Sequence, residues 1–179
     1  MGLSRQTVSL FSKNYRDVKA LYLAAFPAVE RLPYLPLVLN AQRRLANFYA
    51  YYDDEKFVGL AYLLENKEVV YLFFLAVNTK IRSRGYGTAI LQDIKKLAGE
   101  RPIILAMEPL DKTAQNYQQR VKRVDFYKKN GFKITDYYYH EGKEVYQVMA
   151  TDDALDIRSV ERLTKKAVLG LISTSFEKN

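Results

Sequence analysis

The sequence contains no cysteine and only one histidine among its 179 residues. Without cysteine, disulfides and a thiolate nucleophile are excluded, and a single histidine argues against a structural zinc site, so we expect no metal. No stretch approaches the ~18 apolar residues of a membrane span. The first ten residues carry one Arg and no long apolar run, unlike a signal peptide. These absences predict a cytoplasmic protein that does not enter a membrane.

The composition is ordinary for a soluble globular protein, with 49% hydrophobic and 27% charged residues. We find no internal repeat and no low-complexity linker. The net charge of +8 is unevenly placed, because residues 80–133 hold 13 Lys or Arg and 5 Asp or Glu and so carry the whole excess. Such a basic segment can bind a polyanionic small molecule or a nucleic acid.

The most informative stretch is a strand, a basic turn and a helix between residues 69 and 98. Val69 to Val77 contains almost nothing polar, which is typical of a strand buried on both faces. Apolar residues then recur at helical spacing from Ile90 to Leu97. The turn between them carries basic residues and two glycines. Free N–H groups at a helix start favour an anion, so this unit predicts a phosphate-binding turn.

The spacing in the turn is Arg82-x-x-Gly85-x-Gly87. It is neither the GxxxxGK[ST] of a P-loop nor the GxGxxG of a dinucleotide site. It resembles the pyrophosphate-binding motif, Arg or Gln-x-x-Gly-x-Gly or Ala, of the GCN5-related N-acetyltransferases (GNAT), which hold acetyl-CoA. The alternative interpretation is a basic strand–helix connection that binds no ligand.

The rest of the chain predicts the element order β–α–α–β–β–β–α–β–α–β–β. We expect the strand at 103–107 to run parallel to the central strand, because a helix crosses between them. A terminal amphipathic helix is expected within residues 152–179, docked on its own domain or making an oligomer contact as in a homodimer, with a membrane-surface helix as a minor alternative. The expected strands are 7–10, 48–52, 56–65, 69–77, 103–107, 132–140 and 144–149, and the other helices are 15–26, 36–44, one ending at 99, and 116–129.

A second motif, Phe126-Tyr127-x-x-x-Gly131-Phe132, resembles the end of the fourth helix of the same family. With the element order, the resemblance to GNAT spans roughly residues 7–150. It implies an α/β fold with a mixed sheet splayed between its fourth and fifth strands and helices on both faces, plus an extra C-terminal helix. We therefore expect a GNAT-like acetyltransferase domain at 1–152 and a helical extension at 153–179.

The resemblance also implies a site for acetyl-CoA as cosubstrate. The backbone of the central strand would bind the pantetheine arm and the acetyl carbonyl, and the turn would cradle the pyrophosphate. Tyr127 matches the family tyrosine beside the sulfur, a candidate general acid for the departing thiolate, although it could be only a core aromatic. The implied cofactor-binding residues are Leu75, Ala76, Val77, Arg82, Ser83, Arg84, Gly85, Tyr86, Gly87 and Thr88.

Two departures from the family pattern affect the site. An Asn that many members carry before the tyrosine is replaced here, so Asn116 or Arg120 is the candidate to contact the cofactor instead. The central strand has no carboxylate to act as general base. Glu108 and Glu30 are the nearest substitutes by position, although each could be a solvated loop charge, and a water chain could replace a protein base.

The leading prediction is an N-acetyltransferase that moves an acetyl group from acetyl-CoA to a primary amine by direct transfer. The acceptor could be a small-molecule amine or a peptide. One alternative is a non-catalytic acyl-CoA sensor. The other is a nucleic-acid-binding protein, against which we find no helix-turn-helix or RNP-like sequence, so no nucleic-acid partner is expected.

Overall fold

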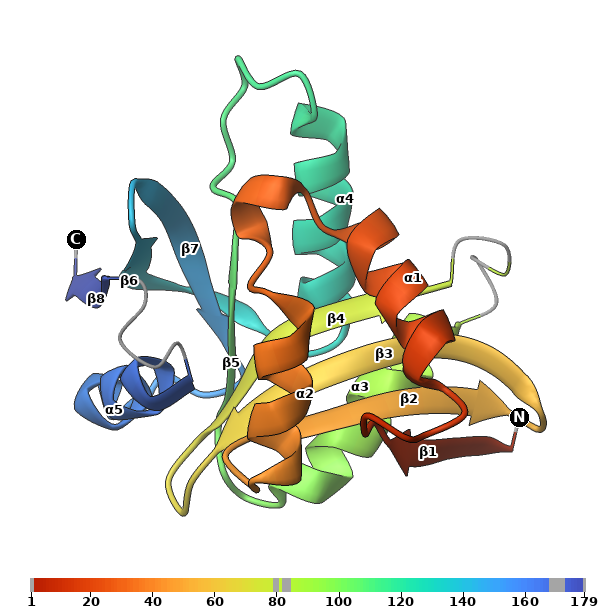
Figure 1. Ribbon diagram of the computed structural model, residues 1–179. Helices are drawn as coiled ribbons and strands as arrows, with labels where there is room; N and C mark the ends of the chain where they lie inside the picture. The colour runs from red at the N-terminus through yellow and green to blue at the C-terminus, as the bar shows by residue number, and fades with distance from the viewer. Residues whose placement is uncertain (1, 79–80, 82–84, 168–172, 179) are drawn as a thin grey trace. The chain divides into compact units, whose positions relative to one another are not determined.

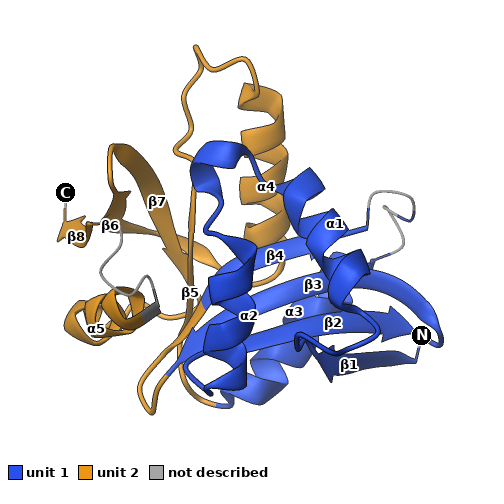
Figure 2. Cartoon of the chain, viewed as in Figure 1, with its two compact units in different colours: residues 1–65, 72–99 blue, residues 66–71, 100–179 orange. Residues whose placement is uncertain are grey.

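The computed structural model describes residues 2–78, 81, 85–167 and 173–178 of the chain (Figure 1). The chain forms two compact units, which Figure 2 colours separately. The first comprises residues 1–65 and 72–99, and the second comprises residues 66–71 and 100–179. Each unit is described by itself below.

The first unit holds the N-terminal helices and the long antiparallel strands. Its elements are β1 (Leu3–Thr7), α1 (Tyr15–Ala25), η1 (Ala28–Glu30), α2 (Tyr34–Gln42), β2 (Asn47–Asp53), β3 (Lys56–Glu65), most of β4 (Val70–Val77) and α3 (Tyr86–Ala98). The helices α1 and α2 lie on one face of β2–β4, and α3 lies on the other (Figure 2). A helix is therefore available on each face to bury the apolar side chains of the strands.

The second unit holds the start of β4 and everything after α3. Its elements are β5 (Ile103–Met107), α4 (Tyr117–Lys129), β6 (Lys133–Glu141), β7 (Glu144–Ala150), α5 (Ile157–Ala167) and β8 (Thr174–Lys178). No helix of the described residues is long and apolar enough to cross a membrane.

The strands form one mixed sheet in the order β1-β2-β3-β4-β5-β7-β6-β8. The pairing of β4 with β5 is parallel, as predicted, and joins Val70 to Ile103 and Tyr71 to Ile104. The paired residues Val70 and Tyr71 are the first two of β4. The neighbouring pairs β2–β3, β5–β7 and β6–β7 are antiparallel.

The core of the first unit is rich in aromatic side chains. Phe74 of β4 lies 5.1 Å from Tyr22 and 4.8 Å from Phe26, between ring centroids, in edge-on contacts. Phe48 and Tyr62 extend this cluster across β2 and β3. Edge-on aromatic pairs contribute stability beyond that of the area the rings bury, so the cluster holds α1 against the sheet.

Two predicted boundaries near the N-terminus are wrong. The first strand is Leu3–Thr7, where 7–10 was predicted. Its residues are mostly exposed and show no apolar alternation, so hydropathy does not mark the strand. The second helix starts at Tyr34 and ends at Gln42, where 36–44 was predicted. Pro36 lies in the first turn of the helix, where its missing N–H costs no hydrogen bond. Arg44 has φ +58°, a left-handed conformation that ends a helix.

The C-terminal segment contains the predicted helix α5 and a strand that was not predicted. Val160, Ser159 and Thr164 of α5 are completely buried. β8 pairs antiparallel with β6, with Thr174 opposite Glu141. Phe176 of β8 packs 4.9 Å from Tyr139, between ring centroids. The segment is therefore part of the second unit in both its helix and its strand.

Candidate functional site

Gly85 begins α3 in the left-handed conformation, at φ +78°. A side chain at this position would be strained by that backbone angle, although a Cβ would meet no atom of the described residues within 4 Å. As far as the described residues show, the backbone at the start of α3 is therefore open on the side where a Cβ would project. Gly85, Tyr86, Gly87 and Thr88 of the prediction all lie at this helix start. Arg82, Ser83 and Arg84 lie outside the described residues.

The apolar face of α3 sets its position on the sheet. Ile90, Leu91 and Ile94 are completely buried. Gly59 of β3 lies beneath the helix, and a Cβ there would come within 2.9 Å of Ile90 Cδ1 and 2.6 Å of the Ala76 carbonyl oxygen. Only glycine lets β3, β4 and α3 approach so closely, so the position of the helix depends on this residue.

Polar contacts fix both the start and the middle of α3. The Tyr86 hydroxyl donates to Asp53 Oδ2 over 2.8 Å. Asp93 accepts two hydrogen bonds from Arg5 Nη1, at 2.7 and 2.8 Å, and one from the Tyr51 hydroxyl at 3.1 Å. These bonds tie α3 to β1 and β2, so the helix start is held at a defined place.

The predicted strand residues Leu75, Ala76 and Val77 form the end of β4. Ala76 is buried, whereas Leu75 and Val77 are half-buried, which is the alternation of a strand with one accessible face. Asn78 then anchors the strand end to β3, because its backbone N–H donates to the Val58 carbonyl at 2.9 Å and its side-chain amide to Phe57 at 3.2 Å.

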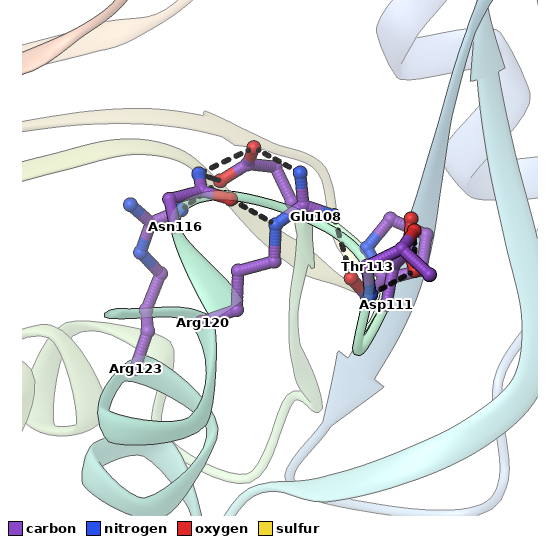
Figure 3. Close-up of polar contacts among 7 residues, drawn as sticks. Glu108, Asp111, Thr113, Asn116, Arg120 and Arg123 are labelled. Atoms are coloured by element: carbon purple, nitrogen blue, oxygen red, sulfur yellow. Dashed lines mark hydrogen bonds and ion pairs between the residues drawn. The ribbon is translucent and has the colours of Figure 1, made fainter. Parts of the chain in front are cut away.

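In the second unit, Glu108 lies in a network with two predicted site residues, Asn116 just before α4 and Arg120 within it (Figure 3). The Asn116 side-chain amide donates to both carboxylate oxygens, at 3.1 and 3.3 Å. Arg120 Nη2 lies 2.9 Å from Glu108 Oε1, and its Nε donates to Asn116 Oδ1 at 2.7 Å. A third bond joins Arg120 Nη1 to the Pro109 carbonyl at 2.8 Å. The network therefore fastens the start of α4 to the end of β5.

Arg123 completes the network and was not predicted. Its Nη1 donates to Glu108 Oε2 over 3.2 Å. The signal in the sequence is the spacing of Asn116, Arg120 and Arg123, which puts all three on one side of a helix. Glu108 thus accepts from Asn116, which precedes α4, and from Arg120 and Arg123 of α4, and an incoming amine would compete with them for its lone pairs.

Tyr127 lies on the buried side of α4, with 9% of its surface exposed. Its ring contacts Phe132 at 5.6 Å and Phe126 at 5.2 Å, between centroids. Burial raises the pKa of the Tyr127 hydroxyl to about 12, and the nearby positive charge of Arg123 opposes this only in part. The hydroxyl therefore stays protonated at neutral pH, as a proton donor must.

Glu30, the other predicted carboxylate, ends η1 and is half-buried. It belongs to the first unit, whereas Glu108, Asn116, Arg120 and Tyr127 belong to the second. The structure brings Glu108, Asn116 and Arg120 together by contact. Among the described residues, no group of three or more His, Asp or Glu could hold a metal ion.

The two sets of residues offer complementary chemistry. The first unit supplies an accessible strand face and a helix start where N–H groups and the helix dipole suit phosphate oxygens. The second supplies a protonated phenol on a helix that an ion network holds in place. Anion binding and proton donation are the two functions that these residues support.

A family model described as an acetyltransferase (GNAT) domain matches residues 44–134, just over half of the chain. That range includes the Gly85 turn, the Glu108 network and Tyr127. No curated protein matches the chain.

Solved structures share the fold at low sequence identity. A GNAT-family protein from Bacteroides thetaiotaomicron is 22% identical, with a TM-score of 0.71 over 90% of this chain and 94% of its own. A GNAT acetyltransferase from Elizabethkingia anophelis, solved with acetyl-CoA bound, is 15% identical, with a TM-score of 0.59 over 84% and 97%. Naa50 from Arabidopsis thaliana, in complex with the bisubstrate analogue CoA-Ac-MVNAL, is 22% identical, with a TM-score of 0.58 over 85% and 99%.

Proposed function

Because this chain belongs to the GNAT acetyltransferase family, we propose that it transfers an acetyl group from acetyl-CoA to a primary amine by direct transfer. The observation that carries the proposal is the open helix start at Gly85, which follows β4 and is fixed to the sheet by Gly59 and Tyr86. Similar chains bind acetyl-CoA or a CoA conjugate, which supports the same cosubstrate here. The cytoplasmic location and the absence of a metal, both expected from the sequence, are part of the proposal.

The residues around the turn fit the cosubstrate. The N–H groups of the first turn of α3 suit its pyrophosphate, and the lack of a side chain at Gly85 leaves room for phosphate oxygens beside the backbone. Arg82 and Arg84 add positive charge by their place in the sequence. The accessible face of β4 at Leu75 and Val77 suits the pantetheine arm.

The cosubstrate supplies an activated acyl group, and the chain's residues supply the proton transfers. In acetyl transfer the amine nitrogen forms a bond to the acetyl carbon, the carbon–sulfur bond breaks, and the amine loses a proton. Tyr127 donates its hydroxyl proton to the departing sulfur, because its raised pKa keeps it protonated until it is needed. The proton from the amine goes to a base or to water.

Glu30 and Glu108 remain the proposed candidates for that base. Asn116, Arg120 and Arg123 already occupy the lone pairs of Glu108, which favours a positioning role for this carboxylate. Water is then the acceptor that requires the least rearrangement. The Glu108 variant described in the Discussion separates these roles.

The test is calorimetric titration of the protein with acetyl-CoA, with free CoA and ATP as comparators. We expect micromolar binding of acetyl-CoA and no binding of ATP. Arg82→Ala should weaken acetyl-CoA binding by about 1.5–3 kcal/mol, the usual loss for a charged hydrogen bond. Lys96→Ala, which removes the same charge from an exposed position on α3, is the matched control.

Released thiol, measured with a panel of amines, then tests transfer. Binding of acetyl-CoA with no transfer to any amine would favour the sensor function over the enzyme. No binding of acetyl-CoA at low salt would overturn both.

A further inference from the structure

The second unit contains a pocket of about 150 Å³ between α4 and the sheet. Its floor is formed by the apolar side chains of Met107, Val124 and Met149, which are almost fully buried. Leu110 and Ile134 stand at its edge, with 48% and 41% of their surfaces exposed. An apolar cavity of roughly this volume holds one benzene molecule, so the pocket is large enough for one branched aliphatic or aromatic group.

An irregularity in β6 forms one wall of this pocket. The register of β6 on β7 shifts between Ile134, opposite Met149, and Tyr138, opposite Gln147. The Gln147 amide donates to the carbonyls of Thr135 and Tyr137, at 2.9 and 3.1 Å. The displaced backbone is therefore hydrogen-bonded, and the irregularity is a stable feature that brings Ile134 and Tyr138 into the pocket lining.

The polar groups of the lining are mainly hydrogen-bond acceptors. The amide protons of Gln147 are already donated to backbone carbonyls, which leaves its Oε1 to accept. Glu108, also in the lining, is engaged by Asn116, Arg120 and Arg123, so a ligand N–H competes with these donors for its carboxylate oxygens. Tyr138 can donate or accept. A ligand that fits this lining carries N–H donors beside an apolar group, as an amine or an amide does.

We propose that this pocket selects the acceptor, taking one branched aliphatic or aromatic side chain of an amino-acid-like or peptide amine. The inference rests on the proposed function. Val124, in the pocket wall, and Tyr127, the proposed proton donor, lie one turn apart on the buried side of α4. Side chains at this spacing are neighbours, so a group bound against Val124 lies next to the residue that serves the reaction.

The methionines give a direct readout of the pocket. The chain has three, of which Met107 and Met149 line the pocket and Met1 is the first residue. In protein loaded with CoA and labelled with ¹³C at the methionine methyl groups, leucinamide or phenylalaninamide at millimolar concentration should shift the Met107 and Met149 signals. Glycinamide, which has the same amine and amide without the side chain, should not.

A matched pair of substitutions tests the location. Ile134→Trp fills the pocket edge, and Val145→Trp makes the same change on β7 at a residue with the same 41% exposure outside the lining. In wild type, we expect leucinamide to be acetylated about 10- to 100-fold more efficiently than glycinamide, since burial of one apolar side chain gives a factor of this size. Ile134→Trp should bring this ratio close to one, and Val145→Trp should leave it unchanged.

The outcomes separate the inference from the proposed function. Suppose that acetyl-CoA binds and amines are acetylated. If leucinamide and glycinamide are then acetylated equally well by the wild type, or if Ile134→Trp leaves the ratio of their efficiencies unchanged, the pocket does not select the acceptor. If acetyl-CoA does not bind but the amides shift both signals in the protein without CoA, the apolar amine site stands and the acetyltransferase proposal fails.

Discussion

The helices α3 and α4 are held against the sheet by different forces. α3 buries a continuous apolar face of Ile90, Leu91 and Ile94. α4 has the same length but buries only Val124 and Tyr127. It is held by the ion pairs of Arg120 and Arg123 with Glu108. The first helix carries the proposed phosphate-binding start, and the second carries the proposed proton donor. Burial of apolar side chains therefore holds the helix of the proposed phosphate site, whereas a polar network holds the helix of the proposed proton donor.

The largest effect should come from the apolar face of α3. Ile90→Ala removes a completely buried side chain and should lower the free energy of unfolding by about 2–5 kcal/mol. Urea denaturation followed by circular dichroism measures it. Gln92→Ala, at an exposed position of the same helix, should change stability by less than about 0.5 kcal/mol. Similar losses in the two variants would show that apolar burial does not hold α3.

On α4, Tyr127→Phe should affect the reaction more than the fold. Without the proton donor, turnover should fall about 100-fold, at the low end for general acid catalysis, which corresponds to about 2.7 kcal/mol. Acetyl-CoA affinity, measured by calorimetry, should change much less. Equal turnover in the two proteins would reduce Tyr127 to a packing residue.

The ion network should respond to the loss of one charge. Glu108→Gln leaves Arg120 and Arg123 without their carboxylate and should cost about 1.5–3 kcal/mol of stability. Asp125→Asn removes the same charge from an exposed position of α4 and is the control. A positioning role predicts a moderate fall in turnover and an unchanged pH profile of kcat. Loss of the acidic limb of that profile would instead identify Glu108 as the base.

The smallest effect is the alkaline response of the buried tyrosines. Below pH 10, Tyr127 is protonated in both the folded and the unfolded chain, so its contribution to stability is fully present. Above pH 10 the unfolded chain loses the proton first, because the folded pKa is about 12. Stability should therefore fall by about 1.4 kcal/mol at pH 11 from this residue. Denaturation curves at pH 9, 10 and 11 check the direction, and Tyr127→Phe should show a smaller decrease.

The same contrast explains what could be predicted from the sequence. The helix α3 and the strands 56–65 and 103–107 were predicted closely, because apolar periodicity records the forces that form them. β8 was missed, because only Thr174 of its residues is buried and the strand forms through backbone bonds with β6. A hydrogen-bonded edge leaves no pattern in side-chain hydropathy.

The candidate site was predicted in the same uneven way. The Gly85 turn and Tyr127 follow from two short motifs of fixed spacing. The contacts among Glu108, Asn116 and Arg120 depend on the path of the loop from Glu108 to Asn116, which spacing does not record. Arg123 was missed for this reason, and so was the pocket, which arises from an irregular register between two strands.

The position of β8 has a consequence for how the protein should be handled. β8 is the terminal strand of the sheet, and it covers the backbone edge of β6 and the rings of Tyr71 and Tyr139. A version shortened to residue 152, the expected end of the acetyltransferase domain, would present β6 as a bare template for other chains. Purification tags therefore belong at the N-terminus, and the last residues should be kept to avoid intermolecular strand addition.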